Sequence, residues 1–227
     1  MKDSILGLLK FGKQPHIKSL QEGTIYMNPV NYFEKIEGNK IIGDKEEGLS
    51  LHLQPDNITV KIDDHIIDNE DIVSPISVRR YKDQNANIFC IYAISLKEVV
   101  ENSFEFKLDK RVKQFGDKCL VIMNGEEFVN RIKKAVKKIN SKAIWYEKGM
   151  GLVEYVERDN FHGQVGVFKK FNKYEYQNEF RIALRVSKEL RGEKGEFKLE
   201  IGDISDISII CDTDELEAEI DIKHDEN

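Results

Sequence analysis

The sequence predicts an α+β fold: a single domain whose mixed, mostly antiparallel β-sheet is flanked by a few helices. Segments with strand-like hydrophobic patterns outnumber those with helical periodicity. Most steps between successive strands are too short for a helical crossover, which disfavours a doubly wound parallel sheet. The 227 residues are 40% hydrophobic and 33% charged, a composition typical of a folded chain with a sizeable core.

The first third of the chain mixes short helices and strands. Pro15 and Gly23 are typical of the start and stop of a helical turn, and Pro29 ends a strand. The elements expected in this part are a short amphipathic helix at 3–10 that runs into extended residues 10–12, a helical turn at 15–20, a strand at 24–28, a helical turn at 30–36, a polar glycine-containing loop at 37–48, and meander strands at 50–53, 58–62 and 66–67.

The middle of the chain contains the strongest strand and the clearest helix. Residues 87–95 are apolar on both faces, which predicts a central strand. Residues 125–140 carry apolar side chains at helical spacing, with acidic residues at the start. Four lysines form the outer face of this helix: Lys133, Lys134, Lys137 and Lys138. We interpret that face as a solvated surface, with a phosphate-facing patch as the alternative.

The remaining elements are mainly strands. They are expected at 117–124, 143–147, 152–156, 164–168, 180–186, 196–201 and 207–211, with helical turns at 96–101 and 109–115. Residues 1–212 are expected to form the single domain, and residues 213–227 an acidic tail that frays or docks loosely.

Composition limits the possible partners and compartment. A net charge of −6 argues against a protein that coats nucleic acid, although it leaves room for a local basic groove. No apolar run approaches the roughly 20 residues of a membrane span, and the N-terminus is too short and polar for a signal peptide. Three cysteines far apart suit a reducing cytosol. We therefore expect a cytoplasmic protein without membrane contact.

Common catalytic motifs are missing from the sequence, including the nucleotide-binding glycine loops, Gly-x-Ser-x-Gly and His-Glu-x-x-His. The spacing of cysteines and histidines predicts no structural metal site. Asp44, Glu46 and Glu47 form an acidic cluster in a loop, which keeps a metal-dependent nuclease as one alternative.

The most suggestive motif is Gln177-x-Glu179 in a tyrosine-rich run. Period-two alternation places Gln177, Glu179 and Arg181 on one face of a strand and the apolar residues between them in the core. Cleavage of a nicotinamide–ribose bond builds positive charge on the ribose, which a strand-borne carboxylate can stabilise. Tyr26, Tyr174 and Tyr176 could stack on nicotinamide. The alternative is that Glu179 only forms an ion pair with Arg181 or Lys173 at the sheet surface.

Several segments resemble an uncharacterised bacterial family that occurs around prophages and abortive-infection loci and carries a domain-of-unknown-function label. The matching segments are Leu9-Lys10-Phe11-Gly12, His16-Ile17-x-x-Leu20-x-x-Gly23-x-Ile25-Tyr26-Met27-x-Pro29-x-x-Tyr32-Phe33, Asp44-x-x-Glu47-Gly48, Phe115-Gly116-Asp117-x-Cys119-Leu120-Val121-Ile122 and Phe168-x-Lys170-x-x-x-Tyr174-x-Tyr176-Gln177-x-Glu179-Phe180-Arg181. This resemblance implies a role in phage defence, with a possible partner protein from a defence or toxin–antitoxin system.

A weaker similarity is to the ADP-ribosyltransferase fold, whose site combines a basic or His residue from the first strand, an aromatic or polar residue from the second and a Glu from a late strand. Lys10 or His16, Tyr26 or Asn28, and Glu179 fill these places in this chain. The chain lacks a clear first-strand His or Arg and a Ser-Thr-Ser step. The similarity implies NAD as the donor and a protein or nucleic acid as the acceptor.

Three functions follow from these patterns. The first is an NAD-using transferase-like enzyme in phage conflict, with Glu179, Tyr26 and Lys10 lining one cleft. Its expected site comprises Glu179, Gln177 and Lys10 as catalytic residues, and Tyr26, Asn28, His16 and Tyr176 as NAD-binding residues. The second is a non-catalytic binding or regulatory module. The third is a metal-dependent nuclease, for which Asp44 and Glu47 should converge with another carboxylate.

Overall fold

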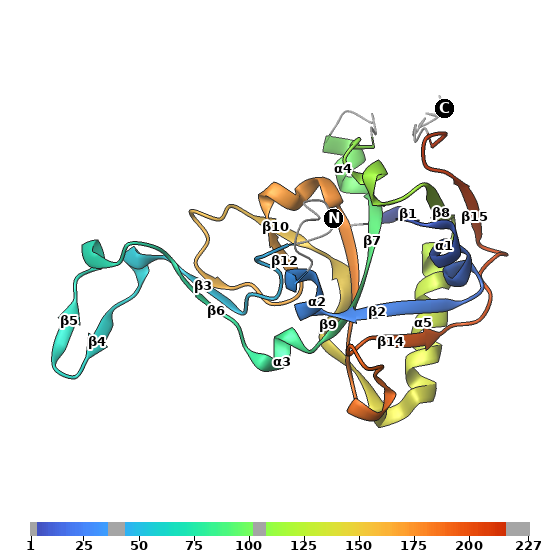
Figure 1. The fold of residues 1–227 in the computed structure, drawn as a ribbon. Helices are drawn as coiled ribbons and strands as arrows, with labels where there is room; N and C mark the ends of the chain where they lie inside the picture. Colours follow the sequence, from blue (N-terminus) through green and yellow to red (C-terminus); the bar gives the residue numbers. More distant parts are fainter. Residues whose placement is uncertain (1–3, 36–43, 102–107, 217–227) are drawn as a thin grey trace, which may run out of the picture.

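A computed structural model describes residues 4–35, 44–101 and 108–216 (Figure 1). The predicted fold class is confirmed: the protein is α+β with mostly antiparallel sheets. The largest sheet in the described chain has eight strands. They are β1 (Ile5–Gly12), β2 (Thr24–Pro29), β7 (Asn87–Ser95), β8 (Lys118–Ile122), β9 (Ala143–Leu152), β13 (Glu179–Val186), β14 (Phe197–Glu200) and β15 (Ser208–Asp212).

The central strand β7 is flanked on both edges, as its apolar sequence predicts. Along one edge it pairs with β13, from Asn87 to Tyr92. Ile88 also pairs with β2 and Tyr92 also pairs with β1, so both of these strands lie on the opposite edge. Within the described chain no strand pairs with residues 89–91 on that edge. The sheet therefore splits there, and β1 and β2 diverge from β7 (Figure 1).

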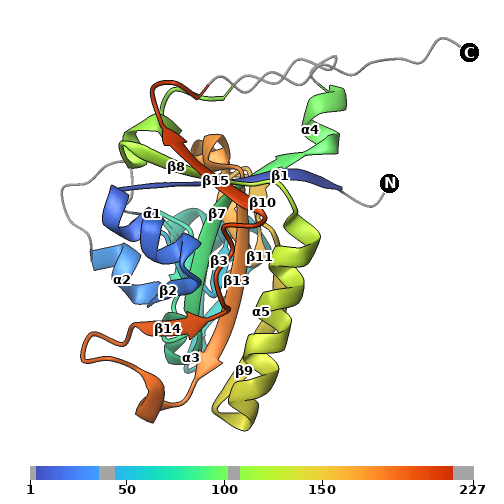
Figure 2. The same cartoon turned by 90° about the vertical axis from the view of Figure 1, so that its right-hand side faces the viewer.

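Two helices cover one face of this sheet. Helix α5 (Gly125–Ile139) starts at Asn124, whose side chain accepts a hydrogen bond from the Glu127 amide at 3.0 Å, a regular N-cap. Its apolar stripe and that of α1 (Gln14–Gln21) pack with the sheet into the main core (Figure 2). The strand alternation of β13 sends Phe180, Ile182 and Leu184 into this core, as predicted.

Smaller elements cover the other face. They are a sheet of β3 (Leu51–Leu53), β6 (Ile76–Val78) and β11 (Gly163–Gln164), the parallel pair β10 (Glu154–Val156) and β12 (Lys169–Phe171), and the short helices α2 (Val30–Lys35), α3 (Tyr81–Gln84) and α4 (Leu96–Glu101). A third core cluster lies under them, around Val30, Tyr146 and Phe168. The packing leaves β13 buried on both faces.

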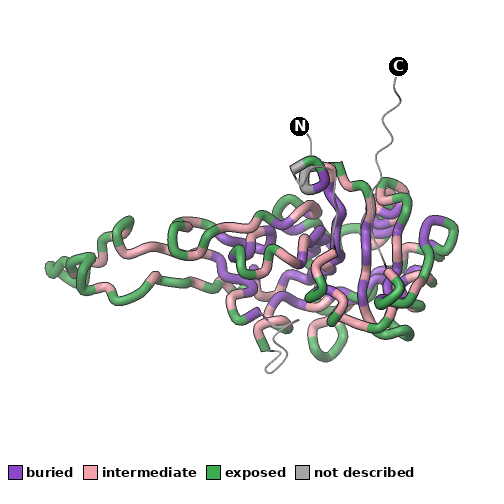
Figure 3. Tube along the Cα trace, turned by 90° about the horizontal axis from the view of Figure 1, so that it is seen from above, coloured by how far each residue is buried: buried purple, intermediate pink, exposed green. Residues whose placement is uncertain are grey.

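A hairpin arm projects from this side of the molecule. Strands β4 (Val60–Ile62) and β5 (His65–Ile67) pair only with each other in the described structure, and 3₁₀ turns at Pro55–Asn57 and Asn69–Asp71 join them to β3 and β6. Figures 1 and 3 show the arm extending well away from the body, with almost entirely exposed or half-buried residues.

Three local predictions were wrong. The helix expected at 3–10 is wrong, because residues 5–12 form strand β1, whose pairing with β7 and β8 outweighs the local helical pattern; only the extended residues 10–12 were predicted correctly. The expected strand at 164–168 is only the two-residue β11, and β12 follows it. Residues 172–177 form a 3₁₀ turn before the strand begins.

The polar loop expected at 37–48 lies mostly outside the described residues. The beginning of the acidic tail is docked, since the Thr213 amide donates to the Asp117 carbonyl and Leu216 packs on a core cluster. Nowhere in the described residues is there an apolar helix of the length that a bilayer crossing requires.

Candidate functional site

The candidate site lies where the sheet splits. Lys10 extends from β1 into the gap. Its Nζ donates at 2.5 Å to the Cys90 carbonyl on β7, on the edge where residue 90 pairs with no strand of the described structure. The ammonium also lies 4.8 Å from the centre of the Phe89 ring. Lys10 thus occupies the edge of β7 that the divergence of β1 and β2 leaves unpaired.

Glu179 opens β13 on the other side of β7, opposite Tyr92. Asn178 adopts a left-handed conformation, φ 37°, which ends the 3₁₀ turn and directs the chain into the strand. The Glu179 amide donates to the Tyr155 hydroxyl at 3.0 Å. These contacts hold the first residue of the strand in place, with its side chain buried.

Arg181 is the largest fully buried side chain of the described protein. Its guanidinium donates to both carboxylate oxygens of Glu47, at 2.8 and 2.6 Å, and to Glu179 Oε2 at 2.6 Å. It also donates to the Val167 carbonyl at 2.8 Å. A bidentate pair with a further carboxylate uses the fixed fork of an arginine fully.

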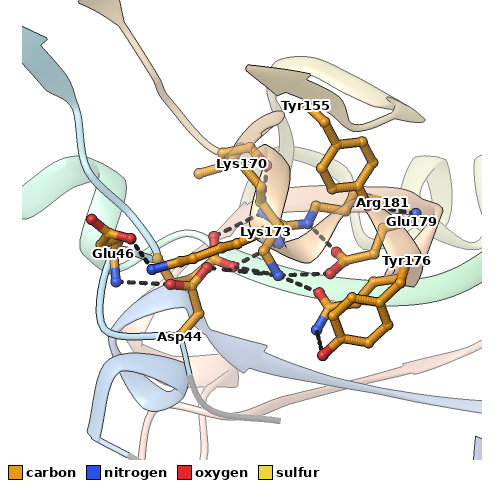
Figure 4. Close-up of polar contacts among 11 residues, drawn as sticks. Asp44, Glu46, Tyr155, Lys170, Lys173, Tyr176, Glu179 and Arg181 are labelled. Atoms are coloured by element: carbon orange, nitrogen blue, oxygen red, sulfur yellow. Dashed lines mark hydrogen bonds and ion pairs between the residues drawn. The ribbon is translucent and has the colours of Figure 1, made fainter. Parts of the chain in front are cut away.

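Lys170, on β12, completes the cluster (Figure 4). Its ammonium donates to Gln177 Oε1 at 2.6 Å and to Glu179 Oε1 at 2.8 Å. Glu47 and Asp44 lie at 3.6 and 3.7 Å from the same nitrogen. We call Asp44, Glu47, Lys170, Glu179 and Arg181 the buried charge cluster. It holds three carboxylates and two cations.

A tight turn brings the two loop acids into this cluster. Asp44 accepts from the Glu46 amide at 2.8 Å through its side chain, and its carbonyl accepts from the Glu47 amide at 3.1 Å. Gly48 follows with a φ of 71°, and a Cβ there would lie 2.3 Å from Val30. Glycine at this position therefore lets the loop approach the body closely.

The protonation states follow from burial and from the paired charges. Burial alone would raise the pKa of Glu179, but the Arg181 guanidinium and the Lys170 ammonium hold it well below the usual carboxyl range. The same competition lowers the pKa of Glu47. For Asp44 the effect of burial is larger than that of the Lys170 ammonium, so the pKa of Asp44 is raised. Glu179 is accordingly an anion at neutral pH.

Lys10 differs from the cations of the cluster. Among the described residues, no carboxylate lies within ion-pair distance of its ammonium. Burial lowers the pKa of Lys10, although the negative charge of Glu179 opposes this shift. A buried ammonium with only a carbonyl and an aromatic ring as neighbours can still accept an anionic ligand group.

A cavity of about 190 Å³ connects Lys10 with the cluster. Its walls are mainly apolar, and its polar lining consists of Lys10, Glu47, Lys170, Gln177, Glu179 and Arg181. A cavity of about 150 Å³ is enough to hold benzene. The site therefore has room for one ring, such as a nicotinamide or a ribose, and the rest of a larger ligand would extend outside.

The structure brings together three of the residues in the predicted site. Lys10, Gln177 and Glu179 all line the cavity. Gln177 reaches it from the 3₁₀ turn and not from the strand, so the predicted geometry was wrong although the proximity is real. The expected pairing of Glu179 with Arg181 is also present, but in the interior and not at the sheet surface.

Three of the four residues predicted to bind NAD lie away from the cavity, and the fourth, Tyr176, packs behind its wall. Tyr26 is 47% exposed, because Ile25 and Met27 on either side point into the core, so it does not share a cleft with Lys10 and Glu179. Asn28 sits where β2 joins β7, and His16 is exposed on α1. Tyr176 packs on the apolar cluster that forms part of the cavity wall, and its hydroxyl accepts from the Gln177 side-chain amide at 3.4 Å. Its ring lies 3.9 Å from the Arg111 guanidinium. None of the four lines the cavity.

The nuclease alternative correctly expected Asp44 and Glu47 to converge with a third carboxylate. The third carboxylate is Glu179, and the ammonium of Lys170 lies among all three. In the described part of the chain, no group of three or more His, Cys, Asp or Glu side chains is arranged to hold a metal ion. Lys170 supplies the positive charge that this alternative assigned to a metal.

Lys170 is the residue that sequence reasoning missed as part of the site. It appears in one of the segments that carry the family resemblance, seven residues before Gln177, but no spacing rule assigns it a role. These segments nevertheless meet in space. Each of the five contributes a residue to the cavity lining: Lys10, Phe33, Glu47, Phe115 and Glu179.

Comparison with known proteins adds no relative to this picture. No family model, no curated protein and no solved structure matches the chain.

Proposed function

We propose that the cavity at the split of the sheet binds the ribose next to the nicotinamide of NAD, with the rest of the donor extending outside, and that the protein is an ADP-ribosyltransferase-like enzyme acting on a protein or nucleic-acid acceptor. One observation carries this proposal: a buried, ionised Glu179 faces a ring-sized cavity that Lys10 and Gln177 also line. The expected association of a first-strand cation with a late-strand glutamate is thus compatible with the geometry.

The chemistry requires an anion fixed near the ribose. As the bond between ribose and nicotinamide breaks, its electron pair leaves with the nicotinamide, and positive charge grows on the ribose. A carboxylate held in advance by Arg181 and Lys170 stabilises this charge without reorganising. Each oxygen of Glu179 accepts one hydrogen bond, and a carboxylate has about four acceptor positions, so a ribose hydroxyl can still donate to it.

Lys10 and Gln177 have separate roles in this proposal. The Lys10 ammonium has no paired carboxylate in the described structure and can interact with a phosphate oxygen of the donor. Gln177 is held by Lys170 beside Glu179, where its amide can meet the acceptor. The acceptor then bonds to the ribose carbon and releases its proton to solvent.

The test is release of nicotinamide from NAD by the purified protein, with water or added protein and nucleic acid as acceptor. Glu179→Gln keeps the size of the side chain and removes its charge. Glu175→Gln is the matched control, since Glu175 is exposed in the preceding turn. We expect Glu179→Gln to reduce the rate by about 100-fold or more, and the control to leave it unchanged. Equal rates in all three proteins would remove Glu179 from the mechanism.

A second candidate function is a non-catalytic binding or regulatory module of a phage-defence system. It is favoured by the complete pairing of Glu179 with two cations, which is also what a structural carboxylate requires. Calorimetric titration with NAD and with a set of nucleic acids separates the two. Binding of NAD without turnover, equally strong in Glu179→Gln, would favour the module.

The setting rests on the family resemblance alone, and we propose that the protein acts in bacterial defence against phage. Expression of the parent protein and of Glu179→Gln in bacteria challenged with phage tests this. Protection by the parent and not by the variant is expected; equal plating of phage on both and on empty cells would contradict it.

A further inference from the structure

The hairpin arm, residues 54–75, combines acidic and aliphatic side chains. Its acidic residues are Asp56, Asp63, Asp64, Asp68, Glu70 and Asp71, against a single Lys61. The arm therefore carries a formal charge of −5, most of the net −6 of the chain. Three aliphatic residues are strongly exposed on it: Ile62 at 60%, Ile66 at 64% and Val73 at 99%.

The arm has no core of its own. None of its residues belongs to the four apolar clusters of the described protein. A lone two-stranded hairpin is only marginally stable in water. An arm that exposes isoleucines on such a hairpin is a candidate contact surface, and its charge specifies a basic partner.

A surface of matching character lies on α5. Lys133, Lys134, Lys137 and Lys138 are all exposed there, and none forms an ion pair in the described structure. Trp145, two positions after the α5-facing Ala143 on β9, lies on the same face and is 38% exposed. We call this set the lysine face. It offers four positive charges beside an exposed aromatic ring.

The arm cannot reach the lysine face of its own chain, because the two lie at opposite ends of the molecule (Figure 1). We propose that the protein self-associates, with the arm of one copy lying on the lysine face of another. Two antiparallel copies satisfy both contacts in a closed dimer. Neither surface includes a residue of the cavity, so self-association is independent of the proposed function.

Charge and apolar contact contribute differently to this association. A single exposed ion pair is weak. Four of them in one contact between arm and lysine face change a dissociation constant by about tenfold, and the two contacts of the closed dimer change it by about 100-fold. This part weakens with salt, because the screening length falls from about 10 Å at 0.1 M to about 3 Å at 1 M. Burial of Ile66 and Trp145 supplies the part that salt does not screen, whereas Ile62 projects from the other face of the hairpin.

Sedimentation of the full chain over a range of concentrations tests the proposal. The monomer mass is 26.3 kDa, and we expect the mass to rise above it as the concentration increases. The dissociation constant of the dimer should be about 100-fold higher in high salt. Ile66→Thr, which keeps a β-branched residue in the strand, should weaken association further. A mass of one chain at every concentration in low salt would overturn the proposal.

Charge reversal identifies the surfaces. The arm variant carries Asp64→Lys, Asp68→Lys, Glu70→Lys and Asp71→Lys, and the face variant carries Lys133→Glu, Lys134→Glu, Lys137→Glu and Lys138→Glu. Each alone should remain monomeric, because both surfaces then have the same sign. An equal mixture should associate again, since each arm meets a face of opposite charge.

The mixture also shows whether a variant is monomeric because its surface has changed or because it has misfolded. Two misfolded variants would not restore association, and all eight changes lie on exposed or half-buried positions outside the core. Association of either variant alone at the parent level, or a mixture that stays monomeric, would show that other surfaces are responsible.

Discussion

Arg181 offers the most informative single substitution. Arg181→Leu removes the guanidinium that binds both oxygens of Glu47 and one oxygen of Glu179. Leucine fills part of the volume, so the main effect is electrostatic. Glu47, Glu179 and Asp44 then share the single positive charge of Lys170 in a site that is almost completely buried.

The expected loss is large compared with the stability of the protein. Removing one partner of a buried ion pair costs about 3–5 kcal/mol, because the remaining charge is left without compensation. Domains have a free energy of unfolding of only about 5–15 kcal/mol. With a urea dependence of about 2–3 kcal/mol per M for a chain of this size, the midpoint of unfolding should fall by about 1–2 M.

Urea unfolding followed by circular dichroism measures this change. Arg185→Leu is the matched control, since Arg185 lies on the same strand but is exposed. Its midpoint should move by much less. A midpoint for Arg181→Leu within about 0.3 M of the parent would show that the cluster contributes little, and would refute the reasoning.

The pH dependence gives a second, signed test of the same variant. In the parent, the pKa values of Glu47 and Glu179 lie below their ordinary 4.5, so their contribution to stability is complete above that pH and is lost as pH falls below it. Without Arg181, burial should raise the pKa of at least one of them. The variant should then gain stability relative to the parent between about pH 7 and pH 5. An unchanged difference over this interval would contradict the assignment.

Three further substitutions test other parts of the structure. Tyr146→Phe removes a buried hydrogen bond to the Asp83 carboxylate and should lower the free energy of unfolding by about 1.5–3 kcal/mol in urea; no change would show that Asp83 is satisfied without it. Lys10→Met removes a buried ammonium without a paired carboxylate and should raise the melting temperature by roughly 2–4 °C while abolishing NAD binding in calorimetry; a lower melting temperature would contradict the cost assigned to this charge. Gly116→Ala places a Cβ 2.3 Å from the backbone of Gly12 and should cost about 1–3 kcal/mol; a melting temperature equal to that of the parent would show that the two segments separate freely.

Much of the fold followed from local patterns. The apolar run of β7 and the helical periodicity of α5 were sufficient, because in both cases the pattern and the final environment agree. The helix predicted at 3–10 was wrong for the opposite reason. Strand β1 forms there because it pairs on both edges with segments more than 80 positions away, which no local sequence window contains. The strand geometry predicted for Gln177 was wrong because the tyrosine-rich run forms a 3₁₀ turn. Asn178, in a left-handed conformation, ends this turn, and β13 begins only at Glu179.

The site was predictable only in part. Chemical reasoning singled out Gln177, Glu179 and Lys10, and the structure places them around one cavity. It did not single out Lys170, because a lysine on a two-strand parallel ladder has no distinctive sequence pattern. The prediction for Tyr26 was wrong because of strand divergence. Tyr26 lies on the same face of the sheet as Glu179, since Ile25 and Met27 share the core with Phe180. Beyond Ile88, however, β2 leaves β7 and pairs with β14, which carries Tyr26 away from the cavity.

The bidentate contact between Glu47 and Arg181 joins residues that are 134 positions apart in the chain. Translation proceeds at about 5–20 residues per second, so Arg181 is synthesised, and leaves the ribosome, roughly 7–27 s after Glu47. Until then the carboxylates of the N-terminal part stay solvated and the sheet lacks β13, so the interior can close only after Arg181 has emerged.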